Sequence, residues 1–285
     1  MAAGLTSLAC TTTIHPALAP ESEDLENDAF SHASLDAVLQ RFVDAQGRVD
    51  YRALASDRDA FDRYYSLLSE ISPDDHPAYF ASESDRLAYW INAYNAAVLT
   101  TVLAHYPIRS VGDVRPPAAL FFLPRLSGFF FFQRVRLGDE TMSLYALENE
   151  IVRKRFGEPR IHFALNCASA SCPRLPRRAF EGRDLERRLD EEARRFVAEE
   201  RNVKIDPEQR RIRLSAIFGM YEDDFLDPLR AEGSAEDPTL LDYILPLLSE
   251  EKARRLRACA ECEVEILDFD WALNDQSPVE QAHSR

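Results

Sequence analysis

Residues 160–173 have the sequence Arg-Ile-His-Phe-Ala-Leu-Asn-Cys-Ala-Ser-Ala-Ser-Cys-Pro, and this segment decides the predicted fold. From Arg160 to Asn166, large apolar side chains alternate with polar or small ones, which is the period of a half-buried strand. A loop of small residues follows, from Cys167 to Pro176, and it holds two thiols. Rigid scaffolds commonly place reactive groups in loops at strand ends. The segment therefore predicts a strand that leads into a candidate site.

Helical patterns surround this strand on both sides. The longest covers residues 84–104, with Ser84 as its predicted N-cap, and Pro107 stops it. Further helices are predicted at 34–46, 57–68, 143–156, 184–199, 238–248 and 250–259. Other strands are predicted at 129–137, 203–205, 211–214 and 264–269, with a hairpin between the middle two. The predicted fold class is α+β, a single domain with several helices packed on a small, partly antiparallel sheet.

Length and apolar content suit one large domain. The chain has 285 residues, of which 46% are hydrophobic. The predicted domain covers residues 33–274, between tails at 1–30 and 275–285. Residues 1–19 are apolar and Ala17-Leu18-Ala19 resembles an export cleavage site, but a basic start is absent. Two interpretations stay open, a disordered tail or the remnant of an export signal, and export to the periplasm or cell envelope is favoured over a cytoplasmic location.

Charge and hydropathy narrow the classes of partner. The net charge is −15, which argues against nucleic acid and against anionic membrane surfaces. The densest apolar run, 120–132, is interrupted by Pro124, Arg125 and Gly128 and is too short to cross a bilayer. The sequence thus predicts a protein that is not transmembrane and binds a small molecule or peptide. It predicts no cofactor and no resident metal, and it leaves the oligomeric state open.

The thiols beside His162 allow several chemistries. A nucleophilic cysteine needs a base to supply thiolate, and His162 is the nearest histidine to Cys167 and Cys172. In an extended strand His162 and Cys167 point to opposite faces, so they meet only if the strand ends between them. Other interpretations are a disulfide between the two cysteines, buried free thiols beside a structural histidine, or a zinc site that also uses Cys259 and Cys262.

Polar residues in two predicted helices are further candidates. Asn92 and Asn95 lie one turn apart on the long helix, close to its apolar side. Buried amides need hydrogen-bond partners, so these two either hold a neighbouring loop or orient a catalytic group. Glu148 lies beside Leu144 and Ile151, so we expect it to be partly buried. A buried carboxylate pairs with a cation or holds a raised pKa that suits acid–base work.

Several separated motifs occur together in one order along the chain. They are Asn92-Ala93-Tyr94-Asn95-Ala96, Tyr106-Pro107, Ser143-Leu144 to Glu148, His162-Phe163-Ala164-Leu165-Asn166-Cys167, Ser171-Cys172-Pro173, Leu214-Ser215 with Ile217-Phe218, Tyr221 with Asp224-Phe225, and Asp270-Trp271 with Leu273-Asn274. Over residues 35–274 the chain resembles the domain of unknown function 547 family. The resemblance marks as family positions Asn92, Asn95, Glu148, His162, Asn166, Cys167 and Cys172. Cys259 and Cys262 lie outside its motifs, and this weakens the zinc interpretation.

What the resemblance implies about activity is limited, because the family is named for having none established. Bacterial members are often exported, and some eukaryotic members carry the domain beside glutaredoxin-type modules. The second observation associates the family with thiol chemistry by proximity alone.

These observations support two main hypotheses. The first is a thiol-dependent hydrolase or transferase acting on an amide or thioester, with Cys167 or Cys172 as nucleophile and His162 as base. Asn166 or Glu148 would orient the imidazole, and the loop 168–171, including Ser169 and Ser171, would bind substrate and stabilise an oxyanion. The second is a non-catalytic cell-envelope binding domain with a Cys167–Cys172 disulfide, whose groove is lined by residues 120–132 and the Asn-bearing helix. Metal binding is a third possibility.

Overall fold

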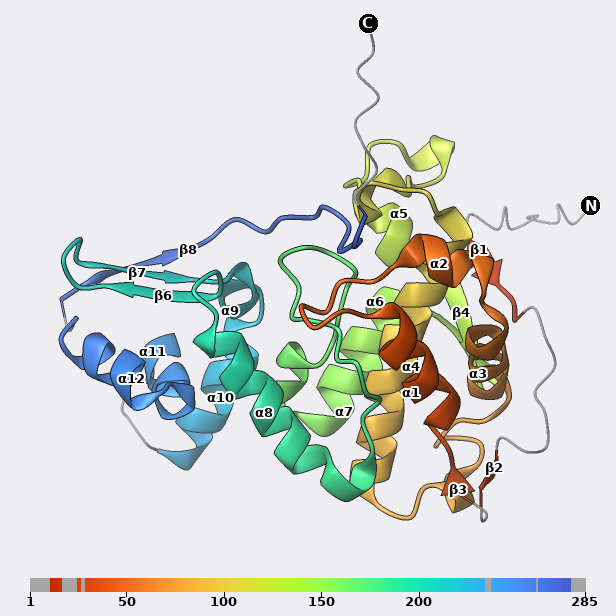
Figure 1. The fold of residues 1–285 in the computed structure, drawn as a ribbon, viewed down its shortest axis with the longest axis horizontal. Coiled ribbons are helices and arrows are strands. Elements are labelled where there is room, and N and C mark those ends of the chain that lie inside the picture. The colour runs from red at the N-terminus through yellow and green to blue at the C-terminus, as the bar shows by residue number, and fades with distance from the viewer. Residues whose placement is uncertain (1–10, 17–24, 27–28, 234–236, 260, 278–285) are drawn as a thin grey trace, which may run out of the picture.

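Helices and short strands alternate along the chain in an α+β arrangement, as predicted (Figure 1). The computed structural model describes residues 11–16, 25–26, 29–233, 237–259 and 261–277. Its α-helices are α1 (Ala33–Phe42), α2 (Tyr51–Ser56), α3 (Asp59–Glu70), α4 (Glu83–His105), α5 (Ser127–Phe130), α6 (Leu144–Ala146), α7 (Lys154–Phe156), α8 (Leu185–Ala198), α9 (Ala216–Met220), α10 (Glu222–Glu232), α11 (Leu240–Ile244) and α12 (Glu250–Arg257). None of the helices in these ranges is long and apolar enough to cross a membrane.

Two small sheets lie at opposite ends of the molecule (Figure 1). The first has the order β1 (Thr12–Ile14), β4 (Gln133–Leu137), β5 (Glu140–Ser143), and the second the order β6 (Val203–Asp206), β7 (Arg211–Leu214), β8 (Glu263–Ile266). Each combines an antiparallel hairpin with one parallel strand. A third, two-stranded pair joins β2 (Leu25–Glu26) to β3 (Ala29–Phe30). The predicted hairpin at 203–214 is thus confirmed, and the last strand pairs parallel to it.

The core has two hydrophobic clusters that share one helix. Leu185 and Leu189 of α8 pack in the larger cluster with α1–α4, whereas Phe196 and Val197 of the same helix pack in the smaller cluster with β6, β7 and α9–α12. The helical spacing of these four residues in the sequence predicts that they face the core. Because α8 contributes to both clusters, it holds the two ends of the molecule together.

The longest helix, α4, runs through the larger cluster. Every residue from Leu87 to Leu103 is buried, so the helix is surrounded on all sides. Its N-cap is Ser82, which corrects the prediction of Ser84. The Ser82 hydroxyl accepts from the N–H of Asp85, and the Asp85 carboxylate accepts from the N–H of Ser82. An N-cap needs an extended backbone outside the helix, and Ser84 already lies in its first turn.

Residues 160–166 do not form the predicted strand. Pro159–Phe163 is a 3₁₀ helix, which Glu158 caps by accepting from the N–H of Arg160. The alternation of side chains indicated one buried and one solvent face, but every residue from Ile161 to Asn166 is buried. Polar side chains from neighbouring elements satisfy this segment, and no sheet ladder does. The backbone therefore turns between His162 and Cys167, which an extended strand would not do.

The two predicted tails are partly folded. Thr12–Ile14 is β1, paired with β4, although it lies in the segment 1–30 that was predicted to be a disordered tail or the remnant of an export signal. At the other end, Gln276 donates from its backbone to Val49 and from its side chain to Phe42 and Arg48. The segment 270–277 is therefore part of the fold. The possible export signal lies mostly outside the described residues.

Candidate functional site

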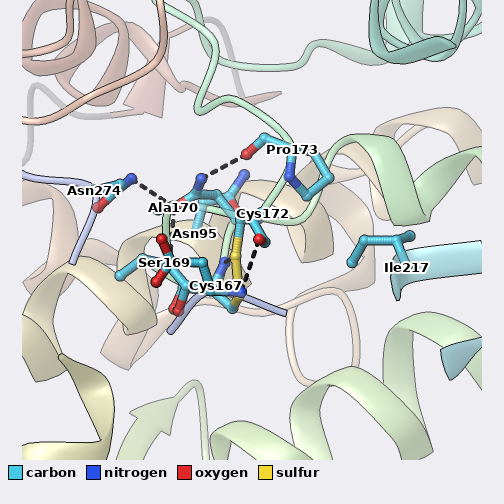
Figure 2. The surroundings of a disulfide bond; sticks show 12 residues. Asn95, Cys167, Ser169, Ala170, Cys172, Pro173, Ile217 and Asn274 are labelled. Atoms are coloured by element: carbon cyan, nitrogen blue, oxygen red, sulfur yellow. Dashed lines mark hydrogen bonds between the residues drawn. A yellow bond between two sulfur atoms is a disulfide. The ribbon is translucent and has the colours of Figure 1, made fainter. Parts of the chain in front are cut away.

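Cys167 and Cys172 form a disulfide at the turn that follows the 3₁₀ helix (Figure 2). Their sulfurs are 1.96 Å apart and their Cα atoms 6.1 Å apart. Cys167 is partly exposed, whereas Cys172 is 2% exposed. The backbone N–H of Cys167 donates to Sγ of Cys172 at 3.0 Å. In this oxidised state neither cysteine is a free thiol, so neither is ready to act as the predicted nucleophile.

The other cysteine pair also forms a disulfide, between Cys259 and Cys262. Zinc binds thiolates, and these four sulfurs are bonded to one another in pairs. Within the described ranges, no group of three His, Cys, Asp or Glu side chains is arranged to hold a metal ion. The four-sulfur zinc interpretation is therefore wrong for this state of the protein.

Three asparagines hold the disulfide loop. Asn95 on α4 donates to the carbonyl of Ala164 at 3.0 Å and accepts from the N–H of Asn166 at 2.8 Å. Asn166 in turn donates across the loop to the carbonyl of Pro173 at 2.7 Å. Asn274, from the C-terminal segment, donates to the Asn166 side chain at 3.2 Å. These contacts make Asn95 and Asn166 clamps of the loop backbone, and Asn166 does not contact His162.

Asn92 also holds backbone, but at Phe180 and not in the disulfide loop. Its side chain donates to the carbonyl of Phe180 at 2.7 Å and accepts from the N–H of the same residue at 2.9 Å. It therefore fixes the segment that leads into α8. Both asparagines of α4 are buried and hydrogen-bonded to backbone, so neither of them lines the predicted groove.

Three of the four loop N–H groups in the predicted oxyanion site, those of Ala168, Ala170 and Ser171, are already hydrogen-bonded. The amide of Ala168 donates to the Asn166 side chain, and those of Ala170 and Ser171 donate to the C-terminal segment at Ala272 and Asp270. The Ser171 hydroxyl also accepts from Asp270, and the buried Ser169 pairs with Leu273. The small residues of this loop thus allow close packing of another backbone, where we had expected a ligand.

His162 is oriented by Asp224, a residue that the sequence pattern did not single out as functional. Its Nε2 lies 2.7 Å from Oδ2 of Asp224, and Arg153 donates two hydrogen bonds to the same carboxylate. The ring stacks on Tyr221 with centroids 4.0 Å apart. Asp224 and Tyr221 belong to one of the motifs that carry the family resemblance, and that motif was the signal available to find them.

Burial and these contacts set the charge of the pair. Burial of His162 lowers its pKa, more than the hydrogen bond with Asp224 raises it. Burial alone would raise the pKa of Asp224, but hydrogen bonds from His162 and Arg153 bring it far below the usual range. At neutral pH Asp224 is therefore an acceptor and His162 is neutral, so Nε2 carries the proton. The other nitrogen, Nδ1, makes no hydrogen bond within the described residues and is left as a base.

Glu148 lies in the same region but does not contact His162, contrary to the predicted orienting role. Its carboxylate accepts from the hydroxyls of Tyr94 at 2.8 Å and Tyr221 at 2.5 Å. It sits on a π-helical stretch, Leu147–Arg153, between α6 and α7. Such stretches are rare and are frequent at functional sites. Glu148 therefore forms no hydrogen bond with His162, but its negative charge acts on the imidazole and raises the pKa of His162.

One small pocket joins these groups. Its volume is about 50 Å³, enough for a water or a few atoms of a ligand. The polar residues and cysteines in its wall are Tyr94, Glu148, His162, Cys167, Cys172 and Tyr221. Phe130, Phe269 and Trp271 supply aromatic surface. The 3₁₀ helix and the loop after it thus bring His162, Cys167 and Cys172 to the wall of one cavity, and the π-helical stretch brings Glu148 to the same wall.

A second and larger pocket lies beyond the disulfide. It has a volume of about 680 Å³, and Cys172 and Pro173 belong to its wall as they do to the wall of the small pocket. Charged residues of both signs line it, namely Arg48, Arg174, Arg195, Glu199, Glu200, Arg201 and Asp275. The disulfide therefore separates a small aromatic cavity from a broad polar one.

Comparison with known proteins gives one match. Residues 79–197 match the family model described as "Protein of unknown function, DUF547", which confirms the resemblance over that segment. The matched segment includes His162, Cys167, Cys172 and Glu148 and stops before Tyr221 and Asp224. No curated protein matches the chain. No solved structure matches it.

Proposed function

We propose that this domain performs thiol–disulfide exchange through the Cys167–Cys172 disulfide, with the Asp224–His162 pair as its proton carrier. The observation that supports this proposal is the shared pocket, in which the two sulfurs and a neutral imidazole line the same wall. Exchange uses the disulfide as it stands, whereas a hydrolase would first need it reduced. The activity is therefore the one that best suits the oxidised site.

The two sulfurs differ in a way that gives the exchange a direction. Cys167 is the more exposed and is open to attack by a substrate thiolate. Attack at its Sγ forms a mixed disulfide and breaks the bond to Cys172, which leaves as a thiolate with the electron pair of that bond. The N–H of Cys167, already 3.0 Å from this sulfur, hydrogen-bonds the developing negative charge.

His162 accounts for the protons. Its free Nδ1 accepts the proton of the incoming thiol, and Asp224 stabilises the imidazolium that results. The imidazolium then protonates the departing Cys172. His162 then takes the proton of a second substrate thiol, which attacks the substrate sulfur of the mixed disulfide. Cys167 leaves with the electron pair of that bond and receives the proton from His162. The net change converts a substrate dithiol and the protein disulfide into a substrate disulfide and two protein thiols, with two electrons and two protons transferred.

A hydrolase or acyltransferase of the reduced form is a second candidate. A reduced Cys167 or Cys172, His162 and Asp224 would form the arrangement of a nucleophile, a base and an orienting carboxylate. The hydrogen bond between His162 and Asp224 favours this candidate, and it replaces Glu148 and Asn166 in the orienting role. The substrate would be an amide or thioester small enough for the pocket wall to admit.

The test is the reduction potential and exchange rate of this one disulfide. The full chain carrying Cys10→Ser, Cys259→Ser and Cys262→Ser is equilibrated in dithiothreitol redox buffers, alkylated and weighed by mass spectrometry. We expect a potential above about −270 mV, in the range of exchange proteins. His162→Gln should slow reduction by a dithiol about tenfold or more at pH 7, with far-UV circular dichroism unchanged.

Two results would separate the rival functions. A potential below about −300 mV with slow exchange would show a structural staple and support the non-catalytic binding domain. Rapid alkylation of the reduced protein by iodoacetamide, together with thioester hydrolysis by the reduced form alone, would support the acyl-transfer candidate. The Asp223→Asn variant is the matched control for Asp224→Asn, because the side chain of Asp223 is 84% exposed and pairs with the exposed Arg230.

A further inference from the structure

The loop from Val114 to Gly128 places two neighbouring aromatic side chains in solvent. Phe121 is 82% exposed and Phe122 is 69% exposed, more than any other large hydrophobic residue of the described chain. Their rings contact edge to face, with centroids 6.1 Å apart. Single exposed apolar residues are ordinary, but paired aromatic rings at the end of a projecting loop indicate an interaction site.

This loop is held in shape by its own backbone. At its base Gly128 packs so tightly that a Cβ there would lie 2.0 Å from the carbonyl oxygen of Val114. At its tip the N–H of Leu120 donates to Pro117 at 2.7 Å and that of Leu123 donates to Leu120 at 3.0 Å. In Figure 1 the yellow-green segment before α5 projects beyond the rest of the fold. The two phenylalanines are therefore presented in advance, and docking orders little additional chain.

Charge around the loop differs from that of the chain as a whole. From Val114 to Gly138 the sequence holds no aspartate or glutamate, although the chain has 49 acidic residues. Arg115 makes no hydrogen bond or ion pair within the described residues. Arg125, whose side chain is 60% exposed, forms an ion pair with Asp113 at 3.6 Å. At physiological salt, charges beyond about 8 Å are largely screened. The surface of the loop is therefore apolar and basic, although the whole chain has a net charge of −15.

We propose that the loop 114–128 docks on a membrane surface that carries anionic headgroups. Phe121 and Phe122 enter the boundary between headgroups and acyl chains, and Arg115 and Arg125 contact lipid phosphates. Peripheral attachment needs both an apolar and an electrostatic contribution, and the loop has both within one short segment. The basic flanks favour lipid over an apolar protein groove. This local charge overrides the expectation from net charge alone.

The experiment is vesicle flotation of the full chain. Vesicles of phosphatidylcholine with phosphatidylglycerol, and vesicles of phosphatidylcholine alone, are compared at 0.15 M salt. We expect binding to the anionic vesicles, reduced about fivefold by loss of each arginine in Arg115→Gln and Arg125→Gln. The double variant Phe121→Ser with Phe122→Ser should lose at least about tenfold. A Phe121→Trp variant should show a blue-shifted emission component, quenched by brominated lipid.

Controls keep the result specific to the loop. Val264→Ser changes an apolar side chain of β8 that is 42% exposed, and it should leave vesicle binding unchanged. Circular dichroism checks that each variant is folded. The proposal is overturned if the wild-type chain does not float with anionic vesicles, or if the double phenylalanine variant floats as well as the wild type. Equal binding to both vesicle types would overturn the role of the arginines.

Discussion

Asp224 accepts a hydrogen bond from Nε2 of His162 across 62 positions of sequence, and the Oδ2–Nε2 distance is 2.7 Å. The same carboxylate also accepts two hydrogen bonds from Arg153. The pair fixes which imidazole nitrogen carries the proton and leaves Nδ1 beside the disulfide pocket. The relationship connects the family-matched segment to α10, which lies outside that match.

Asp224→Asn tests this relationship directly. The amide can hydrogen-bond but has no charge with which to stabilise an imidazolium, so reduction of the Cys167–Cys172 disulfide at pH 7 should slow about tenfold or more. Stopped-flow reduction by a dithiol measures the rate. Asp223→Asn should react as the wild type does. Equal rates in both variants would remove Asp224 from the mechanism.

Asn95→Ala and Asn92→Ala form a matched pair. Each truncation leaves one buried N–H and one buried carbonyl without a partner, so each should destabilise the fold by ~2–4 kcal/mol in urea unfolding. Only Asn95 holds the disulfide loop. The reduction potential should therefore change in Asn95→Ala and stay constant in Asn92→Ala. A shift of the same size in both would show that the potential follows global stability.

The buried His32 should make the folded state less stable in mild acid. Burial lowers its pKa to about 3, from 6.5 in the unfolded chain, and Nδ1 hydrogen-bonds Tyr64. Between these two pKa values the unfolded state binds the additional proton, so stability falls as pH falls. The loss is ~1.4 kcal/mol per pH unit, or about 2 kcal/mol from pH 6.5 to pH 5.

Urea unfolding of the wild type and of His32→Gln measures this slope. The variant should lose the contribution of His32 and retain that of His162, whose lowered pKa acts in the same direction. Well above pH 6.5 both histidines are neutral in both states, so the two proteins should then show parallel curves. An unchanged slope in His32→Gln would contradict the assignment.

Gly47→Ala should cost more than Gly157→Ala, although both glycines have left-handed backbones, with φ of +79° and +59°. At Gly157 nothing lies within 4 Å of an added Cβ, so the cost is that of the backbone alone, ~1 kcal/mol. At Gly47 the added Cβ would lie 2.4 Å from Cβ of Arg174, which adds ~1–3 kcal/mol. Thermal unfolding of the two variants tests the order, and equal costs would contradict the tight contact.

Local sequence patterns predicted helices and their ends well where a single feature, such as helical spacing or a terminal glycine, determined them. The buried residues Phe61, Tyr64, Tyr65 and Leu68 of α3 follow from helical spacing. Gly157 ends α7 in the left-handed conformation, as expected for a glycine after a helix. The same rules gave a wrong result where burial was complete. The alternation at 160–166 predicted a half-buried strand, but the segment is wholly buried and begins as a 3₁₀ helix. Helices α9 and α10 were missed, and Pro228 within α10 is one reason.

The residues of the candidate site were predicted from the sequence, but their hydrogen-bond partners were not. His162, Glu148, Cys167 and Cys172 do line one pocket. The partner of His162 could not be derived from spacing, because Asp224 is brought to it by the packing of α10 against the core. The roles of Asn166 and the loop amides depend on Asn274 and residues 270–272, which no local pattern connects to them.

The segment 270–276 holds the disulfide loop, Val49 and Ser110 through backbone contacts. Synthesis runs from the N-terminus, so Cys167 and Cys172 leave the ribosome well before Asn274 exists. During that interval the loop lacks one of the side chains and all the C-terminal carbonyls that anchor it. Oxidation of the two thiols therefore either precedes the packing of segment 270–276 against the loop or takes place after that segment covers them.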